Sequence, residues 1–325
     1  MAKSPPPKKT PAKSANRSAP AKGGQRGTPS KGGRPAGLFT WLAVGLVVVI
    51  VVVLVVIKVT GGSTPGSSST GFQPTDATTV AQITQIPASV FNTVAVTSPV
   101  AQITPPMLLK PAQPALTATS STGKTLPEVL YIGSEFCPYC AAQRWATIAA
   151  LGRFGTFTGL GNIAVPASET PYGGFPTFTF WKATFKSKYL VFKSVEEFTN
   201  YVPTGASYYK KLQTPTASEM ALFKKYDSPK YVPGLPATDA LSIPFITIGN
   251  KYFVVGASYT PATLANLSRS QIAVGLSQPS LPVTQAIISS ANYQTAAFCV
   301  ITKDQPGSVC TSPGVMAAKR AMGIK

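Results

Sequence analysis

Two cysteines separated by two residues are the part of this sequence most able to do chemistry. Cys137 and Cys140 frame a Cys-Pro-Tyr-Cys motif, and a thiol pair at this spacing can exchange with a disulfide. The chain of 325 residues contains no histidine, which excludes Ser-His-Asp and Cys-His catalysis and any histidine-ligated metal site. The main chemical hypothesis therefore rests on the cysteines.

The other two cysteines, Cys299 and Cys310, close a short loop near the C-terminus. We predict a structural disulfide between them, because an even number of cysteines in two local pairs is typical of an oxidising compartment. A second redox pair that relays electrons is the alternative. Zinc is disfavoured, since the second pair is not spaced as C-x-x-C and no histidine completes a ligand set. We therefore predict no metal and no cofactor.

The residues around the motif predict a strand, a turn and a helix. The apolar run at 129–133 is typical of a buried parallel strand, and the alanine-rich segment after Cys140 has apolar residues at helical spacing. Pro138 suits the first turn of that helix. Cys137 would then lie at the helix N-terminus, where free amides and the helix dipole stabilise a thiolate. We therefore predict Cys137 as the attacking nucleophile and Cys140 as the resolving thiol.

The chain before the motif predicts a membrane anchor. Residues 1–35 are rich in proline, lysine and glycine and predict a disordered tail, whereas residues 36–57 are uncharged and long enough to cross a bilayer as one helix. A flexible linker follows at 58–71. The tail has nine basic residues, against Lys58 alone on the other flank. The positive-inside rule then places the N-terminus in the cytoplasm and the main domain outside, in a single-pass cell-membrane protein.

The same residues allow two alternatives to this anchor. The apolar segment could be a cleaved signal peptide, although no good cleavage site follows Lys58. The basic tail could bind nucleic acid or anionic lipid, since runs of positive charge bind both. We favour the anchor, with the membrane as partner through one helix, and we do not expect nucleic acid as a partner.

The remaining chain predicts one domain at 72–312, with an N-terminal extension over 72–125, and a C-terminal tail at 313–325. Residues 162–165 predict the second core strand. An apolar helix is expected at 286–301, next to the loop between Cys299 and Cys310.

Two sequence patterns in the middle of the domain predict helix starts. Capping boxes begin at Ser194 and at Thr216, so we expect two short helices in an insertion before Pro244. The part of this insertion at 201–236 could shape substrate access or be purely structural.

A second motif lies at 242–256. It predicts a proline followed by a strand, a tight turn and another strand, and Gly249-Asn250 is a two-residue hairpin signal. A helix is expected to begin at Thr260.

Three stretches of the sequence carry a family resemblance: EVLYIGSEFCPYCAAQRWATIAALGRFGTF, TFTFWKATFKSKYLVFKSVEEF and AAFCVITKDQPGSVC. They resemble the thioredoxin-like family known as domain of unknown function 929, over about residues 72–310.

The resemblance implies an α/β, thioredoxin-like fold with a helical insertion and an N-terminal extension. In such proteins a cis proline faces the C-x-x-C motif. The resemblance therefore implies that Pro244 is cis and that the peptide of Ile243 before it can pair with a substrate strand.

Two functions remain open from the sequence. The first is a membrane-anchored thiol-disulfide oxidoreductase that acts on extracytoplasmic protein thiols or disulfides and exchanges electrons with a membrane redox partner. The alternative is a non-catalytic cell-envelope binding module, in which Cys137 and Cys140 form a structural disulfide. The sequence does not indicate the direction of electron flow.

Overall fold

The computed structural model describes residues 72–97, 102–236 and 241–325. The tail, the membrane-spanning segment and the linker predicted before residue 72 lie outside the described residues. Among the helices of the described ranges, none combines the length and the apolar character needed to cross a membrane.

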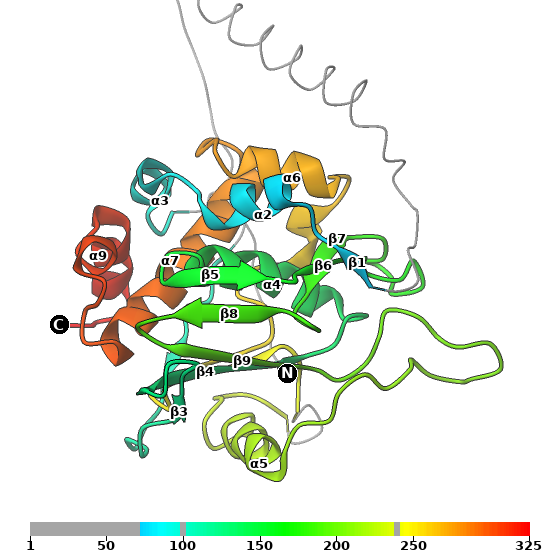
Figure 1. Ribbon diagram of the computed structural model, residues 1–325, viewed down its shortest axis with the longest axis horizontal. Helices are drawn as coiled ribbons and strands as arrows, with labels where there is room; N and C mark the ends of the chain where they lie inside the picture. Colours follow the sequence, from blue (N-terminus) through cyan, green and yellow to red (C-terminus); the bar gives the residue numbers. More distant parts are fainter. Residues whose placement is uncertain (1–71, 98–101, 237–240) are drawn as a thin grey trace, which may run out of the picture. The chain divides into compact units, whose positions relative to one another are not determined.

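The described chain is a mixed α/β fold (Figure 1). In chain order its elements are β1 (Gln73–Pro74), α2 (Ala77–Thr84), α3 (Ala88–Val94), β2 (Met107–Leu108), β3 (Thr117–Thr119), β4 (Thr125–Gly133), α4 (Pro138–Leu151), β5 (Gly155–Thr158), β6 (Gly161–Ala164), β7 (Pro176–Thr179), β8 (Thr184–Ser187), β9 (Val191–Glu196), α5 (Ala217–Tyr226), β10 (Phe245–Ile248), β11 (Tyr252–Val255), the 3-10 helix η2 (Pro261–Leu264), α6 (Arg269–Gly275), α7 (Pro282–Ile301), α8 (Gly307–Cys310) and α9 (Pro313–Ala321).

The sheet that carries the motif is built around β4. Its strand order is β2-β11-β10-β4-β3, and β9 also pairs with β4. Strand β9 runs parallel to β4, whereas β10 is antiparallel to both β4 and β11. Two smaller sheets of the described chain join β1, β6 and β7, and β5 and β8.

The central sheet is covered on both faces. Alternate residues of a strand point to opposite faces, and in β4 Val129 and Tyr131 belong to the core packed under α4 and α7, whereas Leu130 and Ile132 belong to a second core under α5. Figure 1 shows α5 on the side of β4 and β9 opposite to α4 and α7. Burial on both faces explains the continuous apolar run of this strand.

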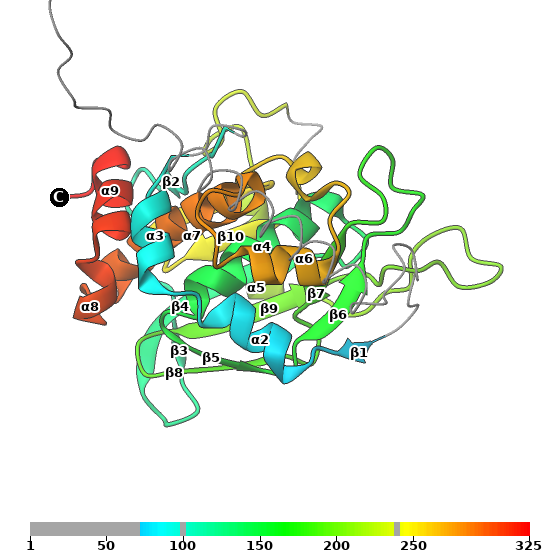
Figure 2. The same ribbon diagram turned by 90° about the horizontal axis from the view of Figure 1, so that it is seen from above.

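Helix α7 is the centre of the helical layer, as the view from above shows (Figure 2). Nearly all of its side chains are buried, and it contacts α3, α4, α6 and α9. The Asn292 side chain donates hydrogen bonds to the carbonyl oxygens of Phe91 and Ala95, at 2.9 and 2.7 Å. The segment 72–97 is therefore an integral part of the fold.

The C-terminal segment corrects the prediction of a tail at 313–325. Residues Pro313–Ala321 form α9, which packs on α3 and α7 and buries Val315 and Ala318 completely. Only one side of this short helix is apolar, and such a stripe needs a partner that a sequence does not identify by itself.

One strand prediction and one helix prediction are also corrected. Residues 161–164 form β6, but this strand lies in a small sheet and buries only alternate residues, while the parallel neighbour of β4 is β9. Ser194 does not start a helix, because it lies inside β9 and pairs with Tyr131. The second capping box is confirmed, since Thr216 and Glu219 cap the start of α5 reciprocally.

The turn and the helix after Pro244 differ in detail from the prediction. Three residues, 249–251, connect β10 to β11, with Gly249 and Asn250 both at positive φ. The helix that opens at Thr260 stops after one 3-10 turn, and Ser268 caps the separate helix α6.

Cys299 and Cys310 form a disulfide between α7 and α8. Replacing both with alanine is expected to lower the free energy of unfolding by about 3 kcal/mol, because the bond restricts the unfolded chain. Chemical denaturation without reductant measures this loss. If the variant kept its stability but lost thiol-disulfide turnover, the pair would instead be an electron relay.

Candidate active site

The end of β4 and the start of α4 position the two cysteines of the motif. Cys137 is the N-cap residue of α4, and its sulfur accepts a hydrogen bond from the backbone amide of Cys140 at 3.2 Å. Its own amide donates to the carbonyl of Ser134 at 3.2 Å. Both cysteines are free thiols, 5% exposed for Cys137 and 0% for Cys140. The more accessible sulfur is therefore the one at the helix N-terminus.

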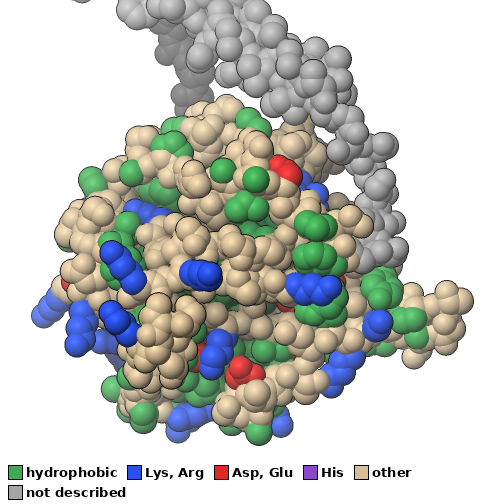
Figure 3. Space-filling model, in the orientation of Figure 1, with side chains coloured by type: hydrophobic (Ala, Val, Ile, Leu, Met, Phe, Trp, Pro, Cys, Tyr) green, Lys and Arg blue, Asp and Glu red, His purple; other side chains and the backbone are tan. Residues whose placement is uncertain are grey.

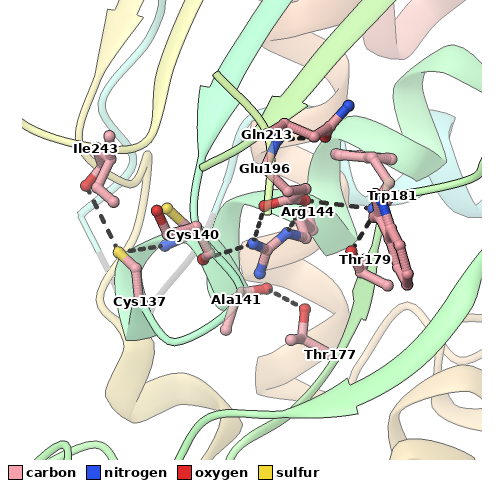
Figure 4. A network of polar contacts seen from close by, with 12 residues as sticks. Cys137, Cys140, Ala141, Arg144, Thr177, Thr179, Trp181, Glu196, Gln213 and Ile243 are labelled. Carbon is pink, nitrogen blue, oxygen red and sulfur yellow. Dashed lines mark hydrogen bonds and ion pairs between the residues drawn. The ribbon is translucent and has the colours of Figure 1, made fainter. Parts of the chain in front are cut away.

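The segment before β10 brings a distant part of the chain to this sulfur. The Ile243–Pro244 peptide bond is cis, and the carbonyl oxygen of Ile243 lies 3.7 Å from the Cys137 sulfur (Figure 4). The pairing of β10 with β4 fixes this approach, because Phe245 is opposite Ile132 at the end of β4. The structure thus brings together the four residues predicted for the site, which are Cys137, Cys140, Ile243 and Pro244. The disulfide Cys299–Cys310 lies in another part of the fold.

The two thiols of the motif differ in acidity. Burial has the largest single effect on the pKa of Cys137 and raises it. The hydrogen bonds from the Cys140 thiol and amide, together with the charge of Arg144, outweigh this effect, so the pKa of Cys137 lies below its ordinary value. Burial raises the pKa of Cys140 well above the ordinary value, and the hydrogen bond to Cys137 and the negative charge there act in the same direction. Cys137 is therefore the thiol that ionises first.

A buried ion pair behind the motif was not found by sequence reasoning. Arg144 lies one turn after Cys140 on α4, and its Nε and Nη2 atoms donate to the Glu196 carboxylate at 2.9 and 2.6 Å. Both side chains are 0% exposed. Figure 4 shows the guanidinium between Glu196 and the motif. The sequence did contain a signal for this ion pair, because Arg144 is the sole charged residue in a helix of 14 residues.

The same guanidinium also holds the loop that leads into the motif. Arg144 Nη2 donates to the carbonyl of Ser134 at 2.6 Å, the oxygen that also accepts the amide of Cys137. The Glu196 carboxylate in turn accepts the amide of Phe180 at 3.2 Å. Arg144 is therefore a positioning residue: it fixes the backbone in front of Cys137 and places a positive charge near both sulfurs.

The difference in acidity predicts the order in which the thiols are alkylated. Since the thiolate is the reactive form, the alkylation rate of Cys137 should rise with pH through a midpoint below the ordinary thiol range, while Cys140 stays unmodified at neutral pH. Mass spectrometry of the reduced protein after iodoacetamide treatment at several pH values measures both rates. Preferential labelling of Cys140, with Cys137→Ser as the control, would contradict this assignment.

A family model described as a domain of unknown function (DUF929) matches residues 116–300. This range contains the Cys-Pro-Tyr-Cys motif, the buried ion pair and Pro244. No curated protein and no solved structure matches the chain. The chemistry of the site therefore follows from its own residues.

Proposed function

The chain belongs to the family described as domain of unknown function 929, which supplies no activity by itself, and from the site we propose a membrane-anchored, extracytoplasmic thiol-disulfide oxidoreductase. The observation that carries this proposal is the placement of the Cys137 sulfur. It lies at a helix N-terminus, accepts the amide of Cys140 and faces the carbonyl of Ile243. The apolar segment at 36–57 and the basic residues before it support the anchor and the orientation.

We further propose that the fold is thioredoxin-like. Parallel strands β4 and β9 joined through α4, followed by antiparallel β10 and β11, support this assignment. The position of the Ile243 carbonyl, just before Pro244 and facing the Cys137 sulfur, supports it as well. The small sheets and the helices α2, α3 and α9 are additions around that core.

The reaction proceeds in two exchanges. The Cys137 thiolate attacks one sulfur of a substrate disulfide, which forms a mixed disulfide and releases the other substrate sulfur as a thiolate that takes up a proton. The Cys140 thiol then loses its proton and attacks the Cys137 sulfur. The second substrate sulfur leaves as a thiolate and takes up the proton that Cys140 lost, the motif becomes a disulfide, and two electrons have passed to the substrate.

The reverse sequence oxidises a substrate dithiol at the expense of the motif disulfide. A redox partner, which we propose to be in the membrane, returns the motif to its starting state. Arg144 favours both thiolates through its charge, and this matters most for Cys140, whose burial opposes ionisation.

Turnover of a model disulfide by the full chain in detergent, with wild type compared to Cys137→Ser, tests the proposed function. We expect turnover in the wild type and none above background in the variant, because the nucleophile is lost. Circular dichroism checks that the variant is folded. No turnover in either protein, with Cys137 unreactive toward alkylation after reduction, would favour a non-catalytic cell-envelope binding module.

A further inference from the structure

Aromatic side chains are concentrated around the motif. Two come from the motif and its approach, one from the loop between β6 and β7, and three from the long loop between β9 and α5 that projects from the body in Figures 1 and 2. We call them the aromatic cluster: Phe136, Tyr139, Tyr172, Phe198, Tyr208 and Tyr209.

The loop between β9 and α5 packs on the residue before Cys137. The ring of Tyr209 stacks on the ring of Phe136, with centroids 4.3 Å apart and planes 2° from parallel. Tyr208 meets the rings of Phe136 and Phe198 edge-on, at 6.0 and 5.2 Å. A β-bridge between Phe198 and Lys211 closes the base of the loop. The loop is therefore anchored to the motif by its aromatic residues.

The loop between β6 and β7 joins the same cluster. Tyr172 meets the ring of Tyr139 edge-on at 5.9 Å. The hydroxyl of Tyr209 donates a hydrogen bond to the carboxylate of Glu169. Two loops from different parts of the sequence are thus joined to each other and to the motif.

Two rings of the aromatic cluster remain largely open to solvent next to a nearly buried nucleophile. Tyr208 is 52% exposed and Tyr139 is 45% exposed. Burial raises the pKa of the Tyr208 phenol, and negative charge at Glu169, Glu197 and Cys137 adds to the shift, as expected if this phenol lies near the reactive sulfur. Exposed rings of this kind do not contribute to the core, so they are available to a ligand.

The charges near the cluster are of both signs. The loop between β9 and α5 contains Lys210 and Lys211 but begins with Glu197, and Glu169 accepts the hydroxyl of Tyr209. Over the face drawn in Figure 3, lysine and arginine side chains are also more numerous than acidic ones. Part of the reason is that Glu128, Glu135, Glu196 and Asp227 are buried. Around Tyr208, however, Glu169 and Glu197 supply negative charge, so the charges beside these rings do not by themselves select an acidic or a basic segment.

The restricted access to Cys137 defines the ligand further. Cys137 is 5% exposed as a residue and its sulfur lies next to the Ile243 carbonyl, so a disulfide on a rigid folded surface cannot reach it easily. A flexible chain segment can enter this space. The exposed rings then offer edge and face contacts to a side chain next to the substrate cysteine, and aromatic pairs favour such contacts beyond the area they bury.

We propose that the aromatic cluster selects unfolded or flexible polypeptide segments in which an aromatic residue lies next to the reactive cysteine. This inference rests on the proposed function, because it assigns a substrate class to the same site. Tyr208 and Tyr139 supply the contact surface, while Phe136 and Tyr209 hold it in place.

Two peptide disulfides that differ only in having tyrosine or serine next to each cysteine test this selection with the full chain in detergent. We expect the wild type to prefer the tyrosine peptide about fivefold to tenfold in kcat/KM, the effect of one aromatic contact. Tyr208→Ser should reduce the preference to about twofold or less. Tyr208→Phe, which keeps the ring, should retain most of it.

A matched control and a small disulfide complete the design. Leu108→Ser changes a similarly exposed side chain on β2, which lies away from the motif, and it should leave the preference intact. Equal kcat/KM for both peptides in the wild type, with Cys137-dependent turnover of bis(2-hydroxyethyl) disulfide, would overturn the selection while the proposed function stands. No turnover of any of the three disulfides would overturn both.

Discussion

Replacing Cys140 with serine is expected to trap the substrate on Cys137 as a stable mixed disulfide and to abolish multiple turnover. The sulfur of Cys140 is fully buried beside Cys137, so it can attack the first mixed disulfide from within the protein, and a serine hydroxyl cannot. The substitution keeps the size of the side chain and the backbone amide that donates to Cys137. Cys137 should therefore still carry out the first exchange at close to its normal rate.

The trapped species is measured by mass spectrometry or by non-reducing gel electrophoresis after a single exposure to substrate. It should contain one substrate molecule on Cys137 and should disappear on addition of dithiothreitol. The double variant Cys137→Ser/Cys140→Ser is the control and should trap nothing. If Cys140→Ser kept full turnover without an adduct, resolution would come from a second substrate thiol, and the assigned role of Cys140 would be wrong.

The local part of the site could be predicted from the sequence because its signals lie within a few residues of one another. The apolar run of β4, Pro138 in the first turn and the apolar spacing of α4 place Cys137 at a helix N-terminus without any knowledge of the rest of the chain. Pro244 could be assigned only by family resemblance, because a proline dipeptide alone does not indicate which isomer a fold selects.

The parts that could not be predicted depend on contacts between distant residues. Glu196 falls inside the capping box predicted to begin at Ser194, yet it lies in β9 and binds Arg144, which is 52 residues away. The prediction of 162–165 as the second core strand is wrong for a related reason: β9 is the parallel neighbour of β4, and a short apolar run does not specify its partner strand. The burial of α9 likewise depends on α3 and α7, which precede it in the chain.

The ion pair between Arg144 and Glu196 should be highly sensitive to the loss of one partner. Arg144→Met is expected to lower the free energy of unfolding by about 3 to 5 kcal/mol, because it leaves the Glu196 carboxylate buried without its cation. The double variant Arg144→Met/Glu196→Met removes both charges, so it should lose clearly less than the sum of the two single changes. Denaturant unfolding of all three variants measures this coupling.

An ion pair on the same sheet with a half-exposed cation provides a comparison for that series. Lys193 and Glu128 are 2.8 Å apart, with the side chains 49% and 4% exposed, and Lys193→Met should cost less than Arg144→Met because water already screens the Lys193 ammonium. Arg144→Met should also move the alkylation midpoint of Cys137 to higher pH, because the guanidinium lowers the pKa of that thiol. A purely structural role would lower stability and leave this midpoint unchanged. The midpoint therefore shows whether the buried Arg144 guanidinium stabilises the Cys137 thiolate as well as the fold.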